Sequence, residues 1–180
     1  SKMIVIVFFC TRKDEFDEPM DGIVYGVAAS LGFAAYENIE YVLYALKEPS
    51  FEIATVRAYT AVPLHALCGI MMGFLITQSI FEKTNNYLNL VLALFIPVGI
   101  HGLYNYSLSS SVISSYFAYI ILIVFIIRSY ILFKTLKRKQ SKSIIFNKKY
   151  YNISISNFAN AASTVLIIYL GLNYCINLIL

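Results

Sequence analysis

Charged residues are scarce in this sequence. Of its 180 residues, 13% are charged and 59% are hydrophobic, and the mean hydropathy is +0.69. Soluble domains contain about 25% charged residues and about 45–50% apolar residues. The scarcity of charge therefore excludes an ordinary soluble domain, and the sequence predicts an integral membrane protein in contact with the lipid bilayer.

Cysteine is also scarce, and common hydrolase motifs are absent. Cys10, Cys68 and Cys175 are odd in number, lie in apolar segments and have no CxxC spacing. Such a set indicates neither a disulfide framework nor a thiolate metal site, so we expect small buried side chains. The sequence also has no HExxH and no GxSxG, the local motifs of zincins and of α/β-hydrolases.

The sequence does contain a series of apolar runs. A helix of roughly 20 residues crosses ~30 Å of hydrocarbon, and lipid offers no partner to an unpaired backbone group. We predict an all-α, polytopic transmembrane helix bundle that forms one domain over residues 1–180, with about five full spans and a clipped N-terminal helix. The predicted segments are 1–10 (partial), 19–46, 54–81, 87–108, 112–133 and 158–180.

Basic residues concentrate in one stretch that we expect to be a loop. Short loops rich in lysine and arginine stay in the cytoplasm, so this stretch orients a multi-pass protein of the cell membrane, with residues 107–111 outside. A topology signal with some attraction to anionic lipid explains the stretch better than nucleic-acid binding, and we expect no nucleic-acid partner. Its basic residues are Lys134, Lys137, Arg138, Lys139, Lys142, Lys148 and Lys149.

Three of the ionisable residues in the predicted spans, one on each of three helices, fall at outer to middle depth in the membrane. At ~1.5 Å per residue, Glu37 lies roughly 27 Å and His101 roughly 21 Å from the inner face, and His65 lies near the midplane. A charge at the bilayer centre costs roughly 2.5–3.5 kcal/mol, so such residues usually face a polar interior. We predict that the three form a functional site, rather than three separate structural hydrogen bonds.

Small residues share the helix faces of these polar groups. Gly26 lies on the face of Glu37, and Gly69 and Gly73 lie on the face of His65. Rows of small residues let membrane helices approach closely. We therefore expect these faces to pack together.

The residue types allow two chemistries. A histidine and a carboxylate can perform general acid–base catalysis, and two histidines with a carboxylate could equally hold zinc. Because His65 and His101 are far apart in the sequence, no local motif identifies metal ligands. We assign none and leave the cofactor open.

The motifs resemble a known family. The stretches "DEFDEPMDGIVYGVAASLGFAAYENIEYVL", "RAYTAVPLHALCGIMMGF" and "HGLYNY" resemble the PrsW family of intramembrane proteases, glutamic-type enzymes related to the CAAX prenyl protease superfamily. The resemblance extends from residue 2 to about residue 106. Its blocks are an EExxK motif, an FxxxEN-like motif, a histidine block after an arginine, and a final histidine motif.

The resemblance implies a role for each matching residue. It implies that His101, His65 and Glu37 are catalytic, and it assigns supporting roles to Asn38, Asn105, Arg57 and Lys2. Lys2 matches the lysine of EExxK, so the glutamate pair is expected just before Ser1, in a part of the active site that this chain lacks. With His101, that pair would activate water, while Asn105 or Asn38 would stabilise the oxyanion or orient the histidine.

The implied function is that of an intramembrane peptidase. Its substrate would be a membrane-anchored protein cut near the extracytoplasmic side, for example an anti-sigma factor at site 1 in a signalling pathway. One alternative is a non-catalytic membrane binding or immunity protein of the same fold, which would not need His101. A transporter is the other, although it would need polar groups along a route to both faces.

Overall fold

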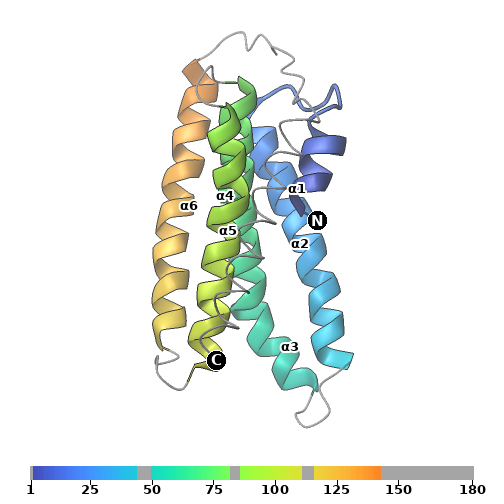
Figure 1. Cartoon of the computed structure of the whole chain (residues 1–180), viewed down its shortest axis with the longest axis vertical. Helices are drawn as coiled ribbons and strands as arrows, with labels where there is room; N and C mark the ends of the chain where they lie inside the picture. The colour runs from blue at the N-terminus through green and yellow to red at the C-terminus, as the bar shows by residue number, and fades with distance from the viewer. Residues whose placement is uncertain (1, 44–49, 82–85, 111–115, 143–180) are drawn as a thin grey trace, which may run out of the picture.

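The computed structural model describes residues 2–43, 50–81, 86–110 and 116–142. The predicted span 158–180, together with Cys175, Lys148 and Lys149, lies outside the described residues. The regular elements within them are helical, and Figure 1 shows the long helices side by side. They are α1 (Lys2–Ile4), the π-helical η1 (Val5–Cys10), α2 (Pro19–Leu43), α3 (Ser50–Tyr59), α4 (Ala61–Phe81), α5 (Asn86–Ser109) and α6 (Tyr116–Lys142).

Among the described residues, three helical stretches are long and apolar enough to cross a membrane. They are Phe51–Phe81, Tyr87–Ser109 and Tyr116–Ser141, which overlap the predicted spans 54–81, 87–108 and 112–133. The predicted all-α transmembrane bundle is therefore confirmed. The helix α2 is 25 residues long, but Glu37, Asn38 and Glu40 reduce the hydropathy of its second half, and it is not one of the three.

The start of α2 is defined by its local sequence. Pro19 occupies the first helical position, where its missing N–H would have no partner in any case. The carboxylate of Asp21 accepts hydrogen bonds from the backbone N–H groups of Glu18 (2.7 Å) and Asp17 (3.1 Å). A carboxylate in the first turn also complements the positive end of the helix dipole.

Four glycines let α2 and α4 pack closely, and these two helices form the most extensive interface of the described bundle. Gly22 and Gly26 of α2 lie against Gly73 and Gly69 of α4, and a Cβ atom at any of the four would collide with the opposite backbone. The expected close approach is confirmed, and it brings the faces of Glu37 and His65 together.

The predicted span 54–81 divides into two helices around Thr60. Pro63 lies in the first turn of α4 and lacks the N–H that a continuous helix would use at that position. The backbone N–H of Thr60 instead bonds to the carbonyl of Arg57 (3.4 Å). This break separates the direction of α3 from that of α4 (Figure 1).

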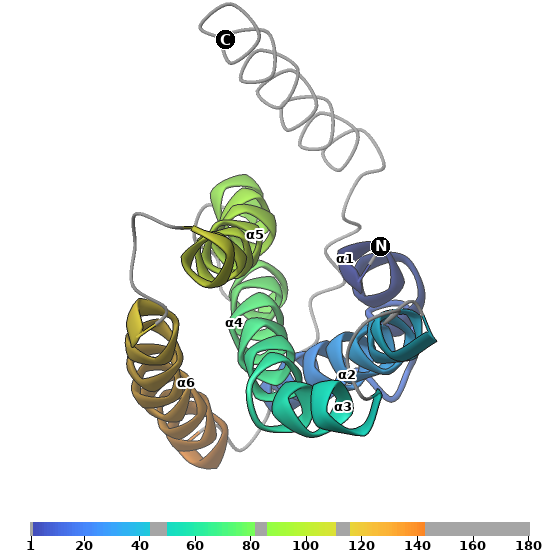
Figure 2. The same cartoon turned by 90° about the horizontal axis from the view of Figure 1, so that it is seen from below.

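The helix α4 occupies the centre of the described bundle. It contacts α2, α3, α5 and α6, and Figure 2 shows it between α2, α5 and α6. Its histidine, His65, is fully buried. Cys68 is a buried free thiol and Cys10 a half-buried one, which agrees with the expectation for these two cysteines.

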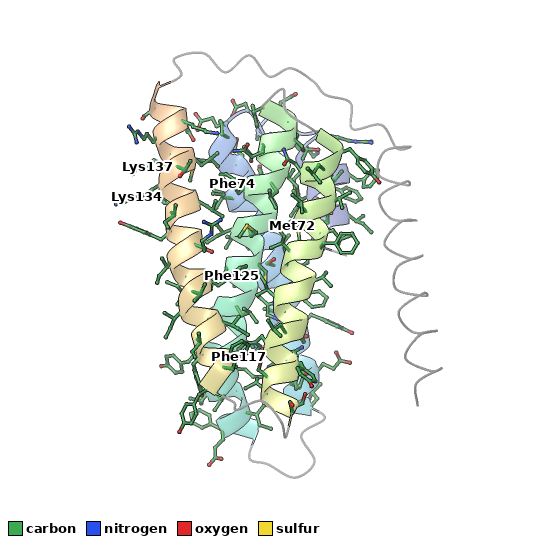
Figure 3. All side chains as sticks on the ribbon, turned by 60° about the vertical axis from the view of Figure 1, so that its left-hand side comes forward. Met72, Phe74, Phe117, Phe125, Lys134 and Lys137 are labelled. Carbon is green, nitrogen blue, oxygen red and sulfur yellow. The ribbon has the colours of Figure 1, made fainter. Side chains whose placement is uncertain are left out.

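The helix α6 extends further than the predicted span 112–133. The basic residues that we expected in a loop continue the helix to Lys142, because lysine, arginine and glutamine are good helix formers. Figure 3 shows Lys134 and Lys137 on α6, beyond Phe117 and Phe125 along the helix. The start of the basic stretch is therefore helical.

Candidate functional site

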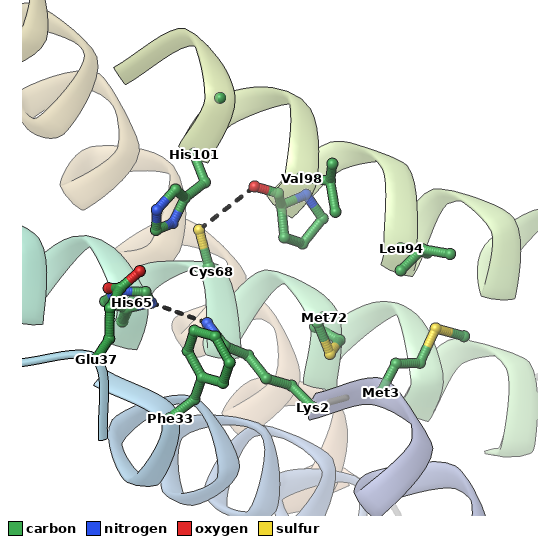
Figure 4. Close-up of a pocket in the computed structure, with 12 residues that line it drawn as sticks. Lys2, Met3, Phe33, Glu37, His65, Cys68, Met72, Leu94, Val98 and His101 are labelled. Carbon is green, nitrogen blue, oxygen red and sulfur yellow. Dashed lines mark hydrogen bonds and ion pairs between the residues drawn. The ribbon is translucent and has the colours of Figure 1, made fainter. Parts of the chain in front are cut away.

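Glu37, His65 and His101 come together between three helices, α2, α4 and α5 (Figure 4). Each offers one ligand atom, and these atoms all lie within 4.8 Å of one another. The ring centroids of the two histidines are 4.7 Å apart. The three residues that the sequence analysis grouped by depth therefore form one cluster.

His65 is held by two hydrogen bonds. Lys2 Nζ lies 2.8 Å from Nδ1, and Glu37 Oε2 lies 2.8 Å from Nε2. A lysine ammonium can only donate, so Nδ1 accepts and Nε2 carries the proton that it donates to Glu37. The imidazole is fully buried, and these two contacts determine both its orientation and its tautomer.

Glu37 also binds Arg57, which reaches the cluster from α3. Arg57 Nη2 donates to Glu37 Oε2 (2.9 Å), and Arg57 Nε donates to Asn38 Oδ1 (2.7 Å). The guanidinium carbon lies 3.8 Å from the centroid of the Tyr41 ring. Arg57 therefore compensates the charge of Glu37 and is itself aligned by α2.

Lys2 connects the N-terminal helix to the cluster. Its ammonium lies 4.6 Å from the centroid of the Phe33 ring, as well as against His65. The contact between Lys2 and His65 therefore brings the first described residue of the chain beside the cluster.

His101 differs from His65 in its surroundings. No hydrogen bond joins its ring to another of the described residues, and the ring stands beside His65. Asn105 follows one turn later on α5 and lines a cavity together with Glu37 and His101. Within the described part of the chain, the nitrogens of His101 therefore have no hydrogen-bond partner.

Two cavities meet at Glu37 and His101. The first has a volume of about 410 Å³ and extends along α4 and α5 toward the side that we predict to be cytoplasmic. The second, called the outer cavity below, has a volume of about 400 Å³ and extends toward α3 and the predicted outer side. The second cavity is lined in part by Tyr41, Arg57, Thr60, Tyr104, Asn105 and Ser109.

Two contributors to the site were not identified from the sequence. Tyr41, which stacks on Arg57, lies four residues after Glu37, so its helical spacing could have indicated it. The apolar wall of the first cavity was also missed. Val98 and Leu94, three and seven residues before His101, lie near the face of His101 on α5.

Comparison with known proteins identifies one family. A family model described as "PrsW family intramembrane metalloprotease" matches residues 1–130. No solved structure matches the chain.

Curated relatives carry the name Protease PrsW. The protein from Geobacillus kaustophilus (strain HTA426) is 40% identical over 107 residues, 59% of this chain and 46% of the relative. The one from Clostridioides difficile (strain 630) is 31% identical over 152 residues, 83% of this chain and 61% of the relative. The one from Bacillus subtilis (strain 168) is 37% identical over 110 residues, which are 61% of this chain and 49% of the relative. The chain spans about half the length of most of these relatives.

Proposed function

The chain belongs to the PrsW family of intramembrane metalloproteases, and we propose that it forms part of the active site of an intramembrane peptidase. The observation that carries this proposal is the cluster of Glu37, His65 and His101 inside a helical membrane bundle. A water-accessible imidazole beside a fixed carboxylate suits peptide hydrolysis. The family name of the curated relatives supports the same activity.

In the proposed reaction, His101 carries the proton. It takes a proton from water as the water oxygen bonds to the peptide carbonyl carbon, and it delivers that proton to the amide nitrogen when the carbon–nitrogen bond breaks. The products are one carboxyl group and one amine. His101 suits this role because its ring makes no hydrogen bond to another described residue.

The neighbouring residues position the reacting groups. Asn105 lines the outer cavity with His101, and its amide N–H groups can donate to the carbonyl oxygen as that oxygen gains negative charge. Glu37 already accepts hydrogen bonds from His65 and Arg57, so we assign it the role of orienting the cluster. Asn38 accepts a hydrogen bond from Arg57, and we assign it to the alignment of that side chain.

The family description implies a metal ion, and the residues fit one. Two imidazoles and one carboxylate form the donor set of several zinc hydrolases, and Glu37, His65 and His101 would hold the ion. His101 would then be a ligand and could not carry the proton, so the reaction described above applies to the site without an ion. The ion would supply a Lewis acid for the carbonyl. Lys2 occupies Nδ1 of His65, so Nε2 faces the cluster and would release its proton on metal binding.

The finer proposals concern membrane topology and substrate. We place the chain in the cell membrane as a multi-pass protein, because basic residues on α6 favour a cytoplasmic end. The substrate would be a membrane-anchored protein, such as an anti-sigma factor, cut near the extracytoplasmic side. The support is the position of the cluster beside the outer cavity, together with the resemblance of the motifs.

The test is to replace His101 with alanine in the complete gene product. Cells that make the wild type or His101→Ala are compared by mass spectrometry for new N-termini near the spans of membrane proteins. We expect termini that depend on the wild type and a loss of about 10²–10⁴-fold in His101→Ala, the usual contribution of general acid–base catalysis.

The matched control is Leu103→Ala, which alters an exposed side chain two residues later on α5. It should produce the wild-type termini. Unchanged termini in His101→Ala at equal membrane abundance would contradict the proposed role of His101. If the wild type produces no new termini, the proposed activity is wrong.

A further inference from the structure

The first cavity is lined mainly by apolar residues. Its volume of about 410 Å³ lies in the range of roughly 300–1,000 Å³ that is typical of ligand sites. Its charged groups and histidines gather at one end, in the cluster. Figure 4 shows apolar side chains from α1, α4 and α5 facing one another beyond that end. These apolar residues include Met3, Met72, Leu94 and Val98.

The chemistry of this wall favours an apolar occupant. The thioethers of Met3 and Met72 are flexible and polarisable, and such side chains adapt to different apolar shapes. The thiol of Cys68 also lines the cavity, but it faces the carbonyl oxygen of Pro97 at 3.8 Å. A polar side chain in this part of the cavity would therefore lose its hydration without gaining a strong partner.

Few side-chain atoms close the first cavity beside His101. Gly102 lines the cavity, and a Cβ atom built on it would meet no described atom within 4 Å. Val98, one turn earlier on α5, is 60% exposed. An extended polypeptide can therefore approach His101 along this side of α5 while one of its side chains enters the cavity.

The outer cavity has a different character. Arg57, Thr60, Asn105 and Ser109 bring charged and hydrogen-bonding groups to its wall. The cluster thus stands at the boundary between a polar cavity toward the outside and an apolar cavity toward the inside. A chain that crosses this boundary would have its polar end outside and its apolar end in the membrane.

We propose that the first cavity binds the side chain on the membrane side of the cleaved bond, and that it selects a large apolar residue such as leucine, methionine or phenylalanine. This inference rests on the proposed function and adds a substrate class to it. Met72, Leu94 and Val98 determine the specificity. One methylene in such a pocket changes the rate by about 10–200-fold, so alanine at that position of the substrate is cleaved at least tenfold more slowly than leucine.

The experiment uses a protein that the complete wild-type peptidase cleaves, as identified by its new N-terminus. The residue on the membrane side of the cleaved bond is changed to leucine or to alanine, and the two cleavage rates are compared in cells. Wild type should prefer leucine at least tenfold. Val98→Phe fills the cavity and should shift the leucine-to-alanine ratio toward alanine by about tenfold, whereas Leu94→Ala enlarges it and should preserve the preference for large residues.

The matched control is Val124→Phe, which makes the same substitution at an exposed valine of α6. It should leave the ratio at the wild-type value. Equal rates for leucine and alanine in the wild type, or a ratio that Val98→Phe does not alter, would overturn the specificity proposal alone. If cleavage does not depend on the wild-type peptidase at all, the proposed function and this inference both fail.

Discussion

At the scale of single residues, Glu37 connects side chains from two other helices. Its Oε2 atom accepts a hydrogen bond from His65 on α4 and another from Arg57 on α3. Two hydrogen-bond donors on one oxygen hold the carboxylate in position. We therefore propose that Glu37 organises the cluster and that His101 carries out the chemistry.

Two substitutions of Glu37 separate its role in orienting the cluster from a purely structural role. Glu37→Gln keeps the size and one acceptor oxygen but removes the charge that aligns Arg57 and His65. We expect cleavage to fall by about 10–100-fold, as for residues that orient a catalytic or ligating imidazole. Membrane abundance should stay near that of the wild type. The measurement is the rate of substrate cleavage, normalised to the amount of peptidase in the membrane.

Glu37→Leu is the companion variant, because it leaves both donors without a partner inside the bundle. We expect a lower melting temperature in detergent as well as a loss of cleavage. Normal cleavage in Glu37→Gln combined with misfolding of Glu37→Leu would assign Glu37 a purely structural role.

At the scale of elements, the close contact of α2 and α4 determines where the site forms. Glu37 lies on α2 and His65 on α4, and four glycines bring these two helices together. Membrane helices associate through van der Waals contact and interhelical hydrogen bonds, so small residues at the contact matter more than apolar area. The break at Thr60 then gives α3 its own direction, and Arg57 of α3 meets Glu37.

Gly26→Ala tests this contact. The new Cβ atom would collide with the backbone of Gly69, so the helices must move apart. We expect a loss of stability of about 1–3 kcal/mol, as for other overpacked sites, measured as a lower melting temperature in detergent. Cleavage should fall too, because His65 and Glu37 separate.

Gly32→Ala is the control on the same helix. A Cβ atom at Gly32 would meet no described atom within 4 Å. Alanine is the better helix former by about 1 kcal/mol, so this variant should be at least as stable as the wild type. If both variants had the same melting temperature as the wild type, close glycine packing would not stabilise the bundle.

At the scale of the whole molecule, the basic residues of α6 and the outer cavity lie toward opposite ends of the helix bundle. The basic residues of α6 lie at one end of the bundle (Figure 3), and the outer cavity with Arg57 opens near the other end. This separation supports a cytoplasmic end at Lys134 and beyond. With the orientation that we propose, the cluster would lie where a substrate can be reached from outside.

Cysteine labelling of intact cells tests this orientation. Leu108 and Lys137 are both exposed, and they lie on α5 and α6 near opposite ends of the bundle. We expect a membrane-impermeant maleimide to label Leu108→Cys in intact cells, and Lys137→Cys only after permeabilisation. The unsubstituted chain measures the background from its native cysteines. The reverse pattern would invert the proposed topology.

Much of the fold follows from the sequence. Apolar runs and the cost of unpaired backbone groups in lipid leave helices as the available structure for the spans. The three residues of the cluster could also be selected, because an ionisable residue inside a span is costly and its depth follows from helical rise. Their catalytic roles remain predictions.

The sequence by itself determined that this is a membrane protein of packed helices, and it predicted Glu37, His65 and His101 at outer to middle depth in the membrane. Only the tertiary structure decided which atoms meet: the hydrogen bond from Lys2 that determines the tautomer of His65, the two contacts of Arg57, and the apolar cavity beside His101. The physical reason is that helical periodicity gives each residue a face and a height, whereas contacts across helices depend on how closely those helices approach and where they bend.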